Sequence, residues 1–186
     1  EPLHEVLADH LLNQLLEADL RLPSELRVGL GRISEQRLDF RGAEVARIDL
    51  YQHRAGTRIE RNHLRGLPYT GISVGWRWGP GLTNCHSNLI AKNSVEEVMR
   101  QAGDGAGIYV VGEQPGTRIL ENYVRDSGGN YWAHGIYMDE SSDHMEVAGN
   151  YVNGAADHSL FMNRNGLNQV FRDNNGEPGP TRLEGK

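Results

Sequence analysis

Residues 119–124 have the sequence Ile-Leu-Glu-Asn-Tyr-Val: an apolar residue, two spacers, an asparagine, one spacer and a second apolar residue. The same unit occupies residues 59–64, 90–95 and 147–152, and a degenerate copy runs over residues 170–174. Successive asparagines of the four clear copies lie 31, 29 and 28 residues apart. A unit that recurs at this long and nearly constant spacing indicates a repeat architecture.

A second unit lies between these copies and places a glycine before a short apolar strand. It occupies residues 71–74, 107–110 and 135–138, with a looser version at 159–162. Two interleaved motifs on one period predict an all-β solenoid, a right-handed parallel β-helix, in which each strand pairs with its equivalent ~4.8 Å away. The repeated asparagine suits a tight turn, where it can bond to local backbone. The alternative, an antiparallel sandwich, requires turn signals every ~8–12 residues and no paired motif on a longer period.

The start of the chain differs from the repeats. Apolar residues between Leu3 and Leu20 follow a helical period of about 3.6 residues, and Pro23 ends this pattern. We therefore predict an N-terminal α-helical cap at residues 1–30, β-helix rungs at 31–175 and a flexible tail at 176–186. A cap on the first rung would cover an unpaired strand edge, which otherwise promotes edge-to-edge aggregation.

The composition excludes several classes of protein. The chain has 186 residues, of which 38% are hydrophobic and 24% charged, enough for one domain with a core and inconsistent with disorder. The net charge is −6 with both signs interspersed, so no nucleic-acid partner is predicted. No apolar run approaches the ~20 residues of a membrane helix, so no membrane partner is predicted. The single cysteine, Cys85, excludes an internal disulfide, and composition does not fix the oligomeric state.

Four phrases of the sequence resemble the pectate-lyase-like β-helix enzymes that act on plant polysaccharides. They are residues 67–76, 104–109, 114–117 and 134–140. Over residues 45–175 the chain resembles glycoside hydrolase family 141, which includes α-L-fucosidases and xylanases. The resemblance implies a secreted or periplasmic protein with a carbohydrate ligand and no cofactor. Such enzymes are normally several times longer and start differently, so a truncated or engineered relative is the alternative.

A glycoside hydrolase needs two carboxyl groups, about 5–5.5 Å apart in retaining enzymes and about 6.5–9.5 Å apart in inverting ones. The resemblance implies that Asp139 and Asp104 form this pair. The strand pattern supports Asp139 independently: with Ile136 and Met138 inward, alternation places Tyr137 and Asp139 outward on one face. The assignment requires Asp139 to be accessible and within about 10 Å of another carboxylate. Otherwise Asp139 begins an ordinary solvated turn.

The alignment of the rungs determines which residues surround Asp139. Placing Ile136 beside Ile108 and Leu160 puts Asp139 between Val111 and Asn163. This alignment makes Asn163 a predicted neighbour of the candidate carboxylate.

Asp104 is harder to bring to this position. It lies four residues before the isoleucine of its rung, whereas Asp139 lies three residues after its own. On straight strands this offset of seven residues spans about 23 Å. The pair therefore requires residues 103–107 to fold back; otherwise Asp104 lies on a surface turn. Glu113 is the substitute catalytic carboxylate, because it lies one rung from Asp139 and near its level.

Aromatic side chains would hold a sugar, because their faces stack on the C–H faces of pyranose rings. We predict that the following residues bind substrate: Trp76, Trp78, Tyr109, Trp132, His134, Tyr137, Glu140 and Asn163. The alternative for each tryptophan is packing beneath a loop. Histidine can also bind metal ions, but no HxH or HxxxH pair occurs and no Gly-Gly-x-Gly-x-Asp repeat occurs, so no metal is predicted.

Three functions follow from these observations. The first is a glycoside hydrolase that acts on a plant cell-wall poly- or oligosaccharide through the carboxylate pair. The second is a non-catalytic β-helix, either a carbohydrate-binding module or an engineered scaffold. The third is a polysaccharide lyase, which is disfavoured because Arg164 is the lone basic residue expected near Asp139.

Overall fold

The computed structural model describes residues 39–41, 48–51, 55–75, 77–81, 83–129, 131–165, 168–176 and 182–185. Within these residues the secondary structure consists of β-strands in three parallel sheets. Sheet A contains β1 (Asp39–Arg41), β3 (Arg58–Glu60), β6 (Leu89–Ala91), β9 (Arg118–Leu120), β12 (Glu146–Ala148) and β15 (Val170–Arg172). Sheet B contains β4 (His63–Arg65), β7 (Ser94–Glu96), β10 (Tyr123–Arg125), β13 (Tyr151–Asn153) and β16 (Asn175–Gly176). Sheet C contains β2 (Ile48–Tyr51), β5 (Ile72–Gly75), β8 (Gly105–Val110), β11 (Ala133–Met138), β14 (Leu160–Asn165) and β17 (Arg182–Gly185).

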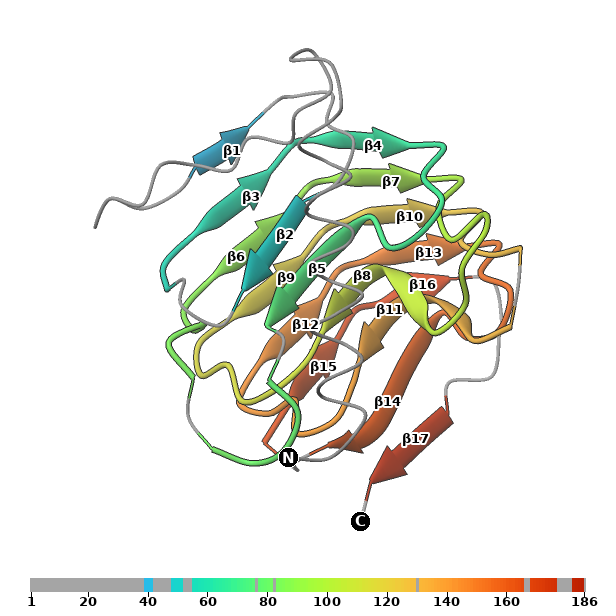
Figure 1. Ribbon diagram of the computed structural model, residues 1–186. Coiled ribbons are helices and arrows are strands. Elements are labelled where there is room, and N and C mark those ends of the chain that lie inside the picture. Colours follow the sequence, from blue (N-terminus) through green and yellow to red (C-terminus); the bar gives the residue numbers. More distant parts are fainter. Residues whose placement is uncertain are drawn as a thin grey trace, which may run out of the picture. The chain divides into compact units, whose positions relative to one another are not determined.

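Consecutive strands belong to different sheets, and each strand pairs in parallel with its equivalent one coil further on. For example, β3, β4 and β5 follow one another along the chain, and they pair with β6, β7 and β8 respectively. Figure 1 shows the strands of each sheet side by side in chain order. This arrangement confirms the predicted parallel β-solenoid. The predicted cap at residues 1–30 lies outside the described residues, and part of the predicted tail lies in β17.

The two repeated sequence motifs supply the core. Their inward positions stack in register from coil to coil and are almost all fully buried. One column comes from sheet A (Ile59, Ile90, Ile119, Val147), one from sheet B (Leu64, Val95, Val124, Val152), and two from sheet C (Ile72, Ile108, Ile136, Leu160 and Val74, Val110, Met138, Met162). No coil buries its apolar side chains alone, so the stability of each depends on its neighbours.

The glycine that precedes the sheet C strands is required by packing. A Cβ atom added at Gly135 would lie 2.2 Å from Cγ1 of Val152 and 2.6 Å from the carbonyl oxygen of Ser159. At Gly107 it would lie 2.5 Å from Cγ1 of Val124. Real Cβ atoms do not approach other heavy atoms so closely. The Gly-Ile motif therefore marks the place where sheets B and C come into contact.

The repeated asparagine has a different role from the one that the sequence predicts. The left-handed backbone conformation belongs to the residue before it, as at Lys92 (φ 56°) and Glu121 (φ 53°). The asparagine side chains instead form a buried ladder along the solenoid. Asn93 Nδ2 donates to Asn122 Oδ1 at 2.9 Å, and Asn122 Nδ2 donates to Asn150 Oδ1 at 2.9 Å. The amides thus satisfy one another between coils, which explains why the residue recurs once per rung.

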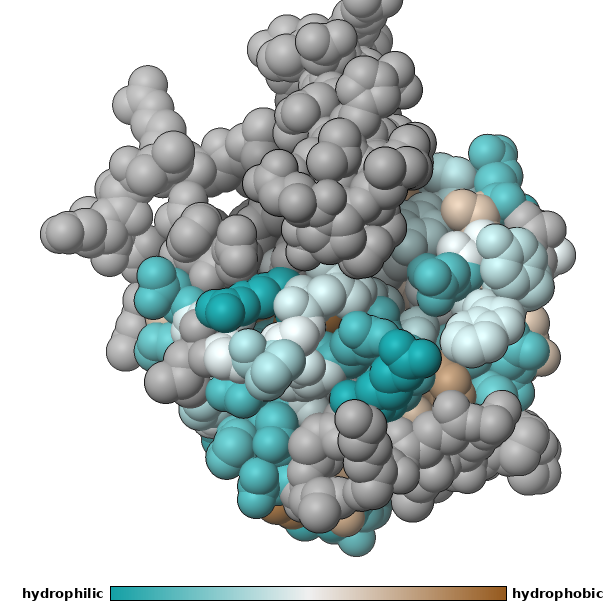
Figure 2. All heavy atoms as spheres, turned by 60° about the horizontal axis from the view of Figure 1, so that its bottom comes forward, coloured by the Kyte–Doolittle hydropathy of each residue, from teal (hydrophilic) through white to brown (hydrophobic). Residues whose placement is uncertain are grey.

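One face of the molecule is mainly polar. Figure 2 shows a face on which hydrophilic residues predominate and hydrophobic residues form small separate patches. Among the residues that the structure describes, no helix has the length and apolar character to cross a bilayer.

Candidate functional site

The candidate site lies on the outward face of sheet C. The observed register pairs Ile136 with Ile108 and with Leu160, as the sequence predicts. Because side chains alternate along a strand, Tyr137 and Asp139 then lie on the opposite face from Ile136. The outward apolar side chains form a cluster of their own, separate from the main core: Ala106, Tyr109, Val111, Tyr137 and Phe161.

Asp139 follows β11 directly and accepts three side-chain hydrogen bonds. Tyr109 Oη donates to Oδ2 at 2.5 Å, Tyr137 Oη donates to Oδ1 at 3.0 Å, and Asn163 Nδ2 donates to Oδ1 at 2.9 Å. The donors come from three consecutive sheet C strands, so the carboxylate joins three coils. Asp139 is only 7% exposed. The accessibility that direct attack on a substrate requires is therefore not present at this carboxylate.

The two phenols that bind Asp139 are fixed as hydrogen-bond donors. Burial raises the pKa of Tyr109, and the negative charge of Asp139 raises it further. Burial and the charges of Asp139 and Asp104 raise the pKa of Tyr137 in the same way. The rings meet edge to face, with centroids 5.2 Å apart. Both phenols consequently stay protonated at any pH at which the protein works.

His134 lies at the centre of an aromatic cluster beside Tyr137. Its ring stacks on Phe161 with centroids 4.3 Å apart and meets Tyr137 edge to face at 4.9 Å. Its Nδ1 lies 3.3 Å from Nδ1 of His158, while its Nε2 is buried and has no hydrogen-bond partner in the described structure. Burial lowers the pKa of His134 to about 4, and the neighbouring His158 lowers it as well. The imidazole is therefore neutral near pH 7.

Asp104 differs from Asp139 because it is exposed to solvent. It precedes β8 in the left-handed conformation, with φ 55°. Although part of the residue is exposed, the protein atoms packed around its carboxyl raise its pKa, and the charge of Asp139 raises it further. Residues 105–110 are extended strand, so the predicted folded-back loop is not formed. The two carboxylates nevertheless interact electrostatically.

Glu113, the predicted substitute for Asp104, lies further along the coil. It forms a parallel bridge with Asp143, not with Asp139, and its carbonyl oxygen accepts a hydrogen bond from Thr83 Oγ1 at 3.1 Å. The side chain is half-buried. The structure thus groups Glu113 with Asp143 at the turn that follows the sheet C strands.

The other predicted binding residues are distributed unevenly. Trp132 is 48% exposed and meets Phe161 edge to face at 5.8 Å, so it borders the aromatic cluster. Trp78 is 44% exposed, and Trp76 lies outside the described residues. Glu140 accepts a hydrogen bond from Arg164 at 2.7 Å. That ion pair occupies the arginine that a lyase mechanism would have to use as its base.

Sequence reasoning missed two members of the cluster, Phe161 and His158. Phe161 stacks on His158 with centroids 4.9 Å apart and contacts Tyr137 at 4.9 Å. The signal for Phe161 was its position opposite Tyr137 in the same register. For His158, which lies outside the strands, the strand pattern gives no position, and its nearness to Asp139 in the sequence is the one signal that it offers.

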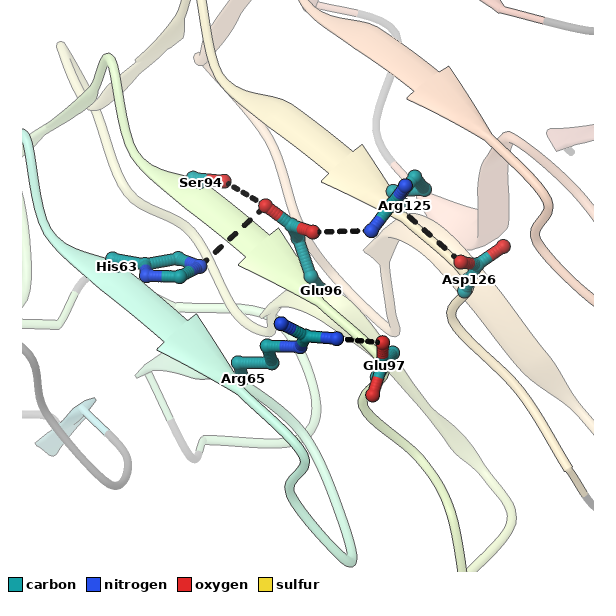
Figure 3. Close-up of polar contacts among 7 residues, drawn as sticks. All are labelled: His63, Arg65, Ser94, Glu96, Glu97, Arg125 and Asp126. Carbon is teal, nitrogen blue, oxygen red and sulfur yellow. Dashed lines mark hydrogen bonds and ion pairs between the residues drawn. The ribbon is translucent and has the colours of Figure 1, made fainter.

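The outward face of sheet B has a different character, shown in Figure 3. Glu96 accepts hydrogen bonds from Ser94 Oγ and Arg125 Nη2, both at 2.7 Å, and His63 Nε2 lies 3.5 Å from its carboxylate. These side chains come from the neighbouring strands β4, β7 and β10 and are partly or largely exposed. In the described part of the chain, no three His, Cys, Asp or Glu side chains gather in a way that could hold a metal ion.

Comparison with known proteins supports the fold. No protein-family model matches the chain, and no curated protein matches it. A solved structure described as a glycoside hydrolase is similar, with a TM-score of 0.65 and 24% sequence identity. The alignment covers 86% of this chain, and the chain spans 28% of the length of that structure. The resemblance to a β-helix protein of the glycoside hydrolase type is therefore confirmed as a similarity of fold.

Proposed function

We propose that this chain is part of a carbohydrate-active enzyme, a glycoside hydrolase related to family 141 that acts on plant cell-wall poly- or oligosaccharides. The observation that carries the proposal is the exposed Asp104 beside the exposed Trp132, whose carbonyl oxygen accepts a hydrogen bond from the amide nitrogen of Gly105 at 3.0 Å; the charge of Asp139 helps to raise the pKa of this acid. A glycosidase needs two carboxyl groups whose environments differ, so that one keeps its proton while the other is ionised.

Asp104 is the proposed general acid. It is exposed, so a glycosidic oxygen can reach it, and its pKa is raised by the packed atoms around it and by the charge of Asp139. A raised pKa lets a carboxylic acid hold the proton that it must give to the leaving group. In the reaction, the proton passes from Asp104 to the glycosidic oxygen as the bond to the anomeric carbon breaks, and a water molecule adds to that carbon while a second carboxylate accepts the proton that the water loses.

The predicted role of Asp139 as the second catalytic carboxylate is not kept, because Asp139 is too buried to meet a substrate; it is proposed instead as a positioning group whose charge helps to raise the pKa of Asp104. Hydrogen bonds from three side chains hold the Asp139 carboxylate in a fixed position. From this position its negative charge helps to raise the pKa of Asp104. Because Asp139, Tyr109 and Tyr137 are 7%, 6% and 1% exposed, this cluster acts on the substrate only through the effect of the Asp139 charge on Asp104. Glu113 is the reserve candidate for the carboxylate that directs water to the anomeric carbon.

The aromatic and polar side chains are the proposed substrate contacts. Trp132 presents a half-exposed indole beside Phe161, suited to a pyranose face. Glu140 follows Asp139 after the end of β11, and Asn163 lies in β14 and donates to Asp139; both are proposed to bond sugar hydroxyls. Trp78, which is 44% exposed, and Trp76, which lies outside the described residues, remain proposed substrate contacts.

One observation favours a second function, a non-catalytic carbohydrate-binding β-helix. Asp139 accepts hydrogen bonds from three coils, through Tyr109, Tyr137 and Asn163. Such a carboxylate can serve only to hold neighbouring coils together. In that case the exposed aromatic side chains bind sugar and no bond is broken.

The two functions are separated by incubation with fucosylated, xylan and pectic oligosaccharides, followed by chromatography of the products. Asp104→Asn and Asp139→Asn should each abolish cleavage while circular dichroism shows a folded protein. Asp126→Asn is the matched control, because Asp126 also has a left-handed backbone (φ 53°) and directly follows β10 of sheet B. Absence of cleavage by the folded wild-type protein, with sugar still bound, would establish the binding module instead.

A further inference from the structure

Tyr131 is the most exposed large hydrophobic side chain that the structure describes, at 72%. Single exposed apolar residues are common on protein surfaces and carry no meaning by themselves. This one precedes β11 in the chain and is followed at once by Trp132, which is 48% exposed. Two exposed aromatic side chains thus occur together at one end of the candidate site.

The ring of Tyr131 is held against the backbone next to Asp104. A Cβ atom added at Gly103 would lie 3.0 Å from Cε1 and 3.1 Å from Cζ of that ring. The ring therefore packs directly on the glycine. The amide nitrogen of Asp104 donates to the carbonyl oxygen of Tyr131 at 3.4 Å, and that of Gly105 donates to the carbonyl oxygen of Trp132 at 3.0 Å. These contacts fix the ring relative to the proposed acid.

A second tyrosine contacts the same residue from the preceding coil. Tyr69 Oη donates to the carbonyl oxygen of Asp104 at 2.8 Å, and Tyr69 is itself half-buried. Asp104 therefore has an aromatic residue of the preceding coil on one side and Tyr131 and Trp132 of the next coil on the other. The site residues predicted from sequence include neither Tyr69 nor Tyr131.

We propose that Tyr131, held in place by its packing on Gly103, is a sugar-binding position for the residue next to the bond that Asp104 protonates. This inference rests on the proposed function. A pyranose ring fits the position because its C–H face can lie on an exposed phenol ring while its hydroxyls reach the polar groups around Asp104. The ring gives this contact at little entropic cost, since the packing on Gly103 already restricts it.

The test compares xylohexaose with xylobiose, by calorimetric binding and by hydrolysis, in matched variants. Tyr131→Ala should raise Kd and KM for xylohexaose about three- to tenfold, leave kcat nearly unchanged, and affect xylobiose less. Gly103→Ala, whose Cβ would lie 2.5 Å from the carbonyl oxygen of Tyr131, should also weaken binding of xylohexaose more than binding of xylobiose, and it should lower kcat because it shifts the backbone beside Asp104. Tyr123→Ala is the control, because Tyr123 is 37% exposed and stacks on Tyr151 on sheet B.

The outcomes separate this inference from the proposed function. If wild-type protein binds xylohexaose without cleaving it and Tyr131→Ala weakens binding, the sugar position stands and the hydrolase assignment fails. If wild-type protein cleaves xylohexaose and Tyr131→Ala behaves like Tyr123→Ala, the hydrolase stands and the sugar position is wrong. If neither xylohexaose nor fucosylated or pectic oligosaccharides bind to the folded wild-type protein, both are overturned.

Discussion

The outward faces of sheets B and C are built on the same coils but differ in how far the surroundings of their carboxylates are exposed to solvent. On sheet B, the Glu96 side chain is 16% exposed, and its charged neighbours His63 and Arg125 are 43% and 39% exposed. On sheet C, Asp139 is 7% exposed and the outward Tyr137 is 1% exposed. A parallel solenoid therefore does not make every outward side chain a surface side chain.

The difference has an energetic consequence. An exposed ion pair gains little, because water and salt screen it and two long side chains lose freedom. A buried carboxylate that accepts hydrogen bonds from three side chains is different, since its removal leaves buried donors without partners. The two faces should therefore respond very differently to equivalent substitutions.

Removal of the central carboxylate should give the largest contrast. Asp139→Ala leaves the hydroxyls of Tyr109 and Tyr137 without their acceptor, and we expect a loss of about 3 kcal/mol in the free energy of unfolding. Glu96→Ala on sheet B should lose about 1 kcal/mol or less. Urea unfolding of both variants measures the difference. Equal losses would show that the two faces are energetically equivalent.

Acid should destabilise the sheet C face through His134. Its pKa is lowered from 6.5 to about 4 by burial and by His158. Between pH 6.5 and pH 4 this histidine binds a proton in the unfolded chain but not in the folded protein. The stability that depends on neutral His134 is therefore fully present above pH 6.5 and is lost as the pH falls toward 4, with a maximum loss of about 3 kcal/mol in the free energy of unfolding. Unfolding free energies measured from pH 7 to pH 4 should show this slope.

A pair of variants checks the assignment of that slope. His134→Gln should flatten the pH dependence between 6.5 and 4, whatever its effect on stability at pH 7. His144→Gln, on a half-exposed turn, should leave it intact. If the slope survives the loss of His134, another group causes it.

The sequence allows part of the site to be predicted and not the rest. The positions of Asp139 and Asn163 follow from strand alternation and the rung period, and the structure has both in contact. The burial of that face does not follow, because alternation marks a residue as outward without saying what covers it. The contact between Gly103 and Tyr131 is also unpredictable, since it joins two coils through turns whose shape no periodicity specifies.

Sheets B and C share one interior, and a substitution at Gly135 tests how tightly it is packed. Gly135→Ala would force its Cβ against Val152 of sheet B and the backbone of Ser159, so we expect a loss of about 1–3 kcal/mol in unfolding free energy. Gly66→Ala is the control, because no atom lies within 4 Å of a Cβ placed there and only its left-handed backbone (φ 69°) opposes the change. A smaller loss of unfolding free energy for Gly135→Ala than for Gly66→Ala would mean that the interior adjusts to the added methyl group.

Salt gives the smallest effect and the most direct test of the contrast between the faces. A hydrogen bond from Ser94 and the neighbouring Arg125 lower the pKa of Glu96, but the network is partly open to solvent. At 1 M NaCl the screening length falls to about 3 Å, so the destabilisation caused by Glu96→Ala should shrink by a few tenths of a kcal/mol. The destabilisation caused by Asp139→Ala should not change, because its hydrogen bonds lie where ions do not penetrate. If salt reduced the destabilisation caused by Glu96→Ala and by Asp139→Ala equally, the burial of Asp139 would not explain why the two faces differ in energy.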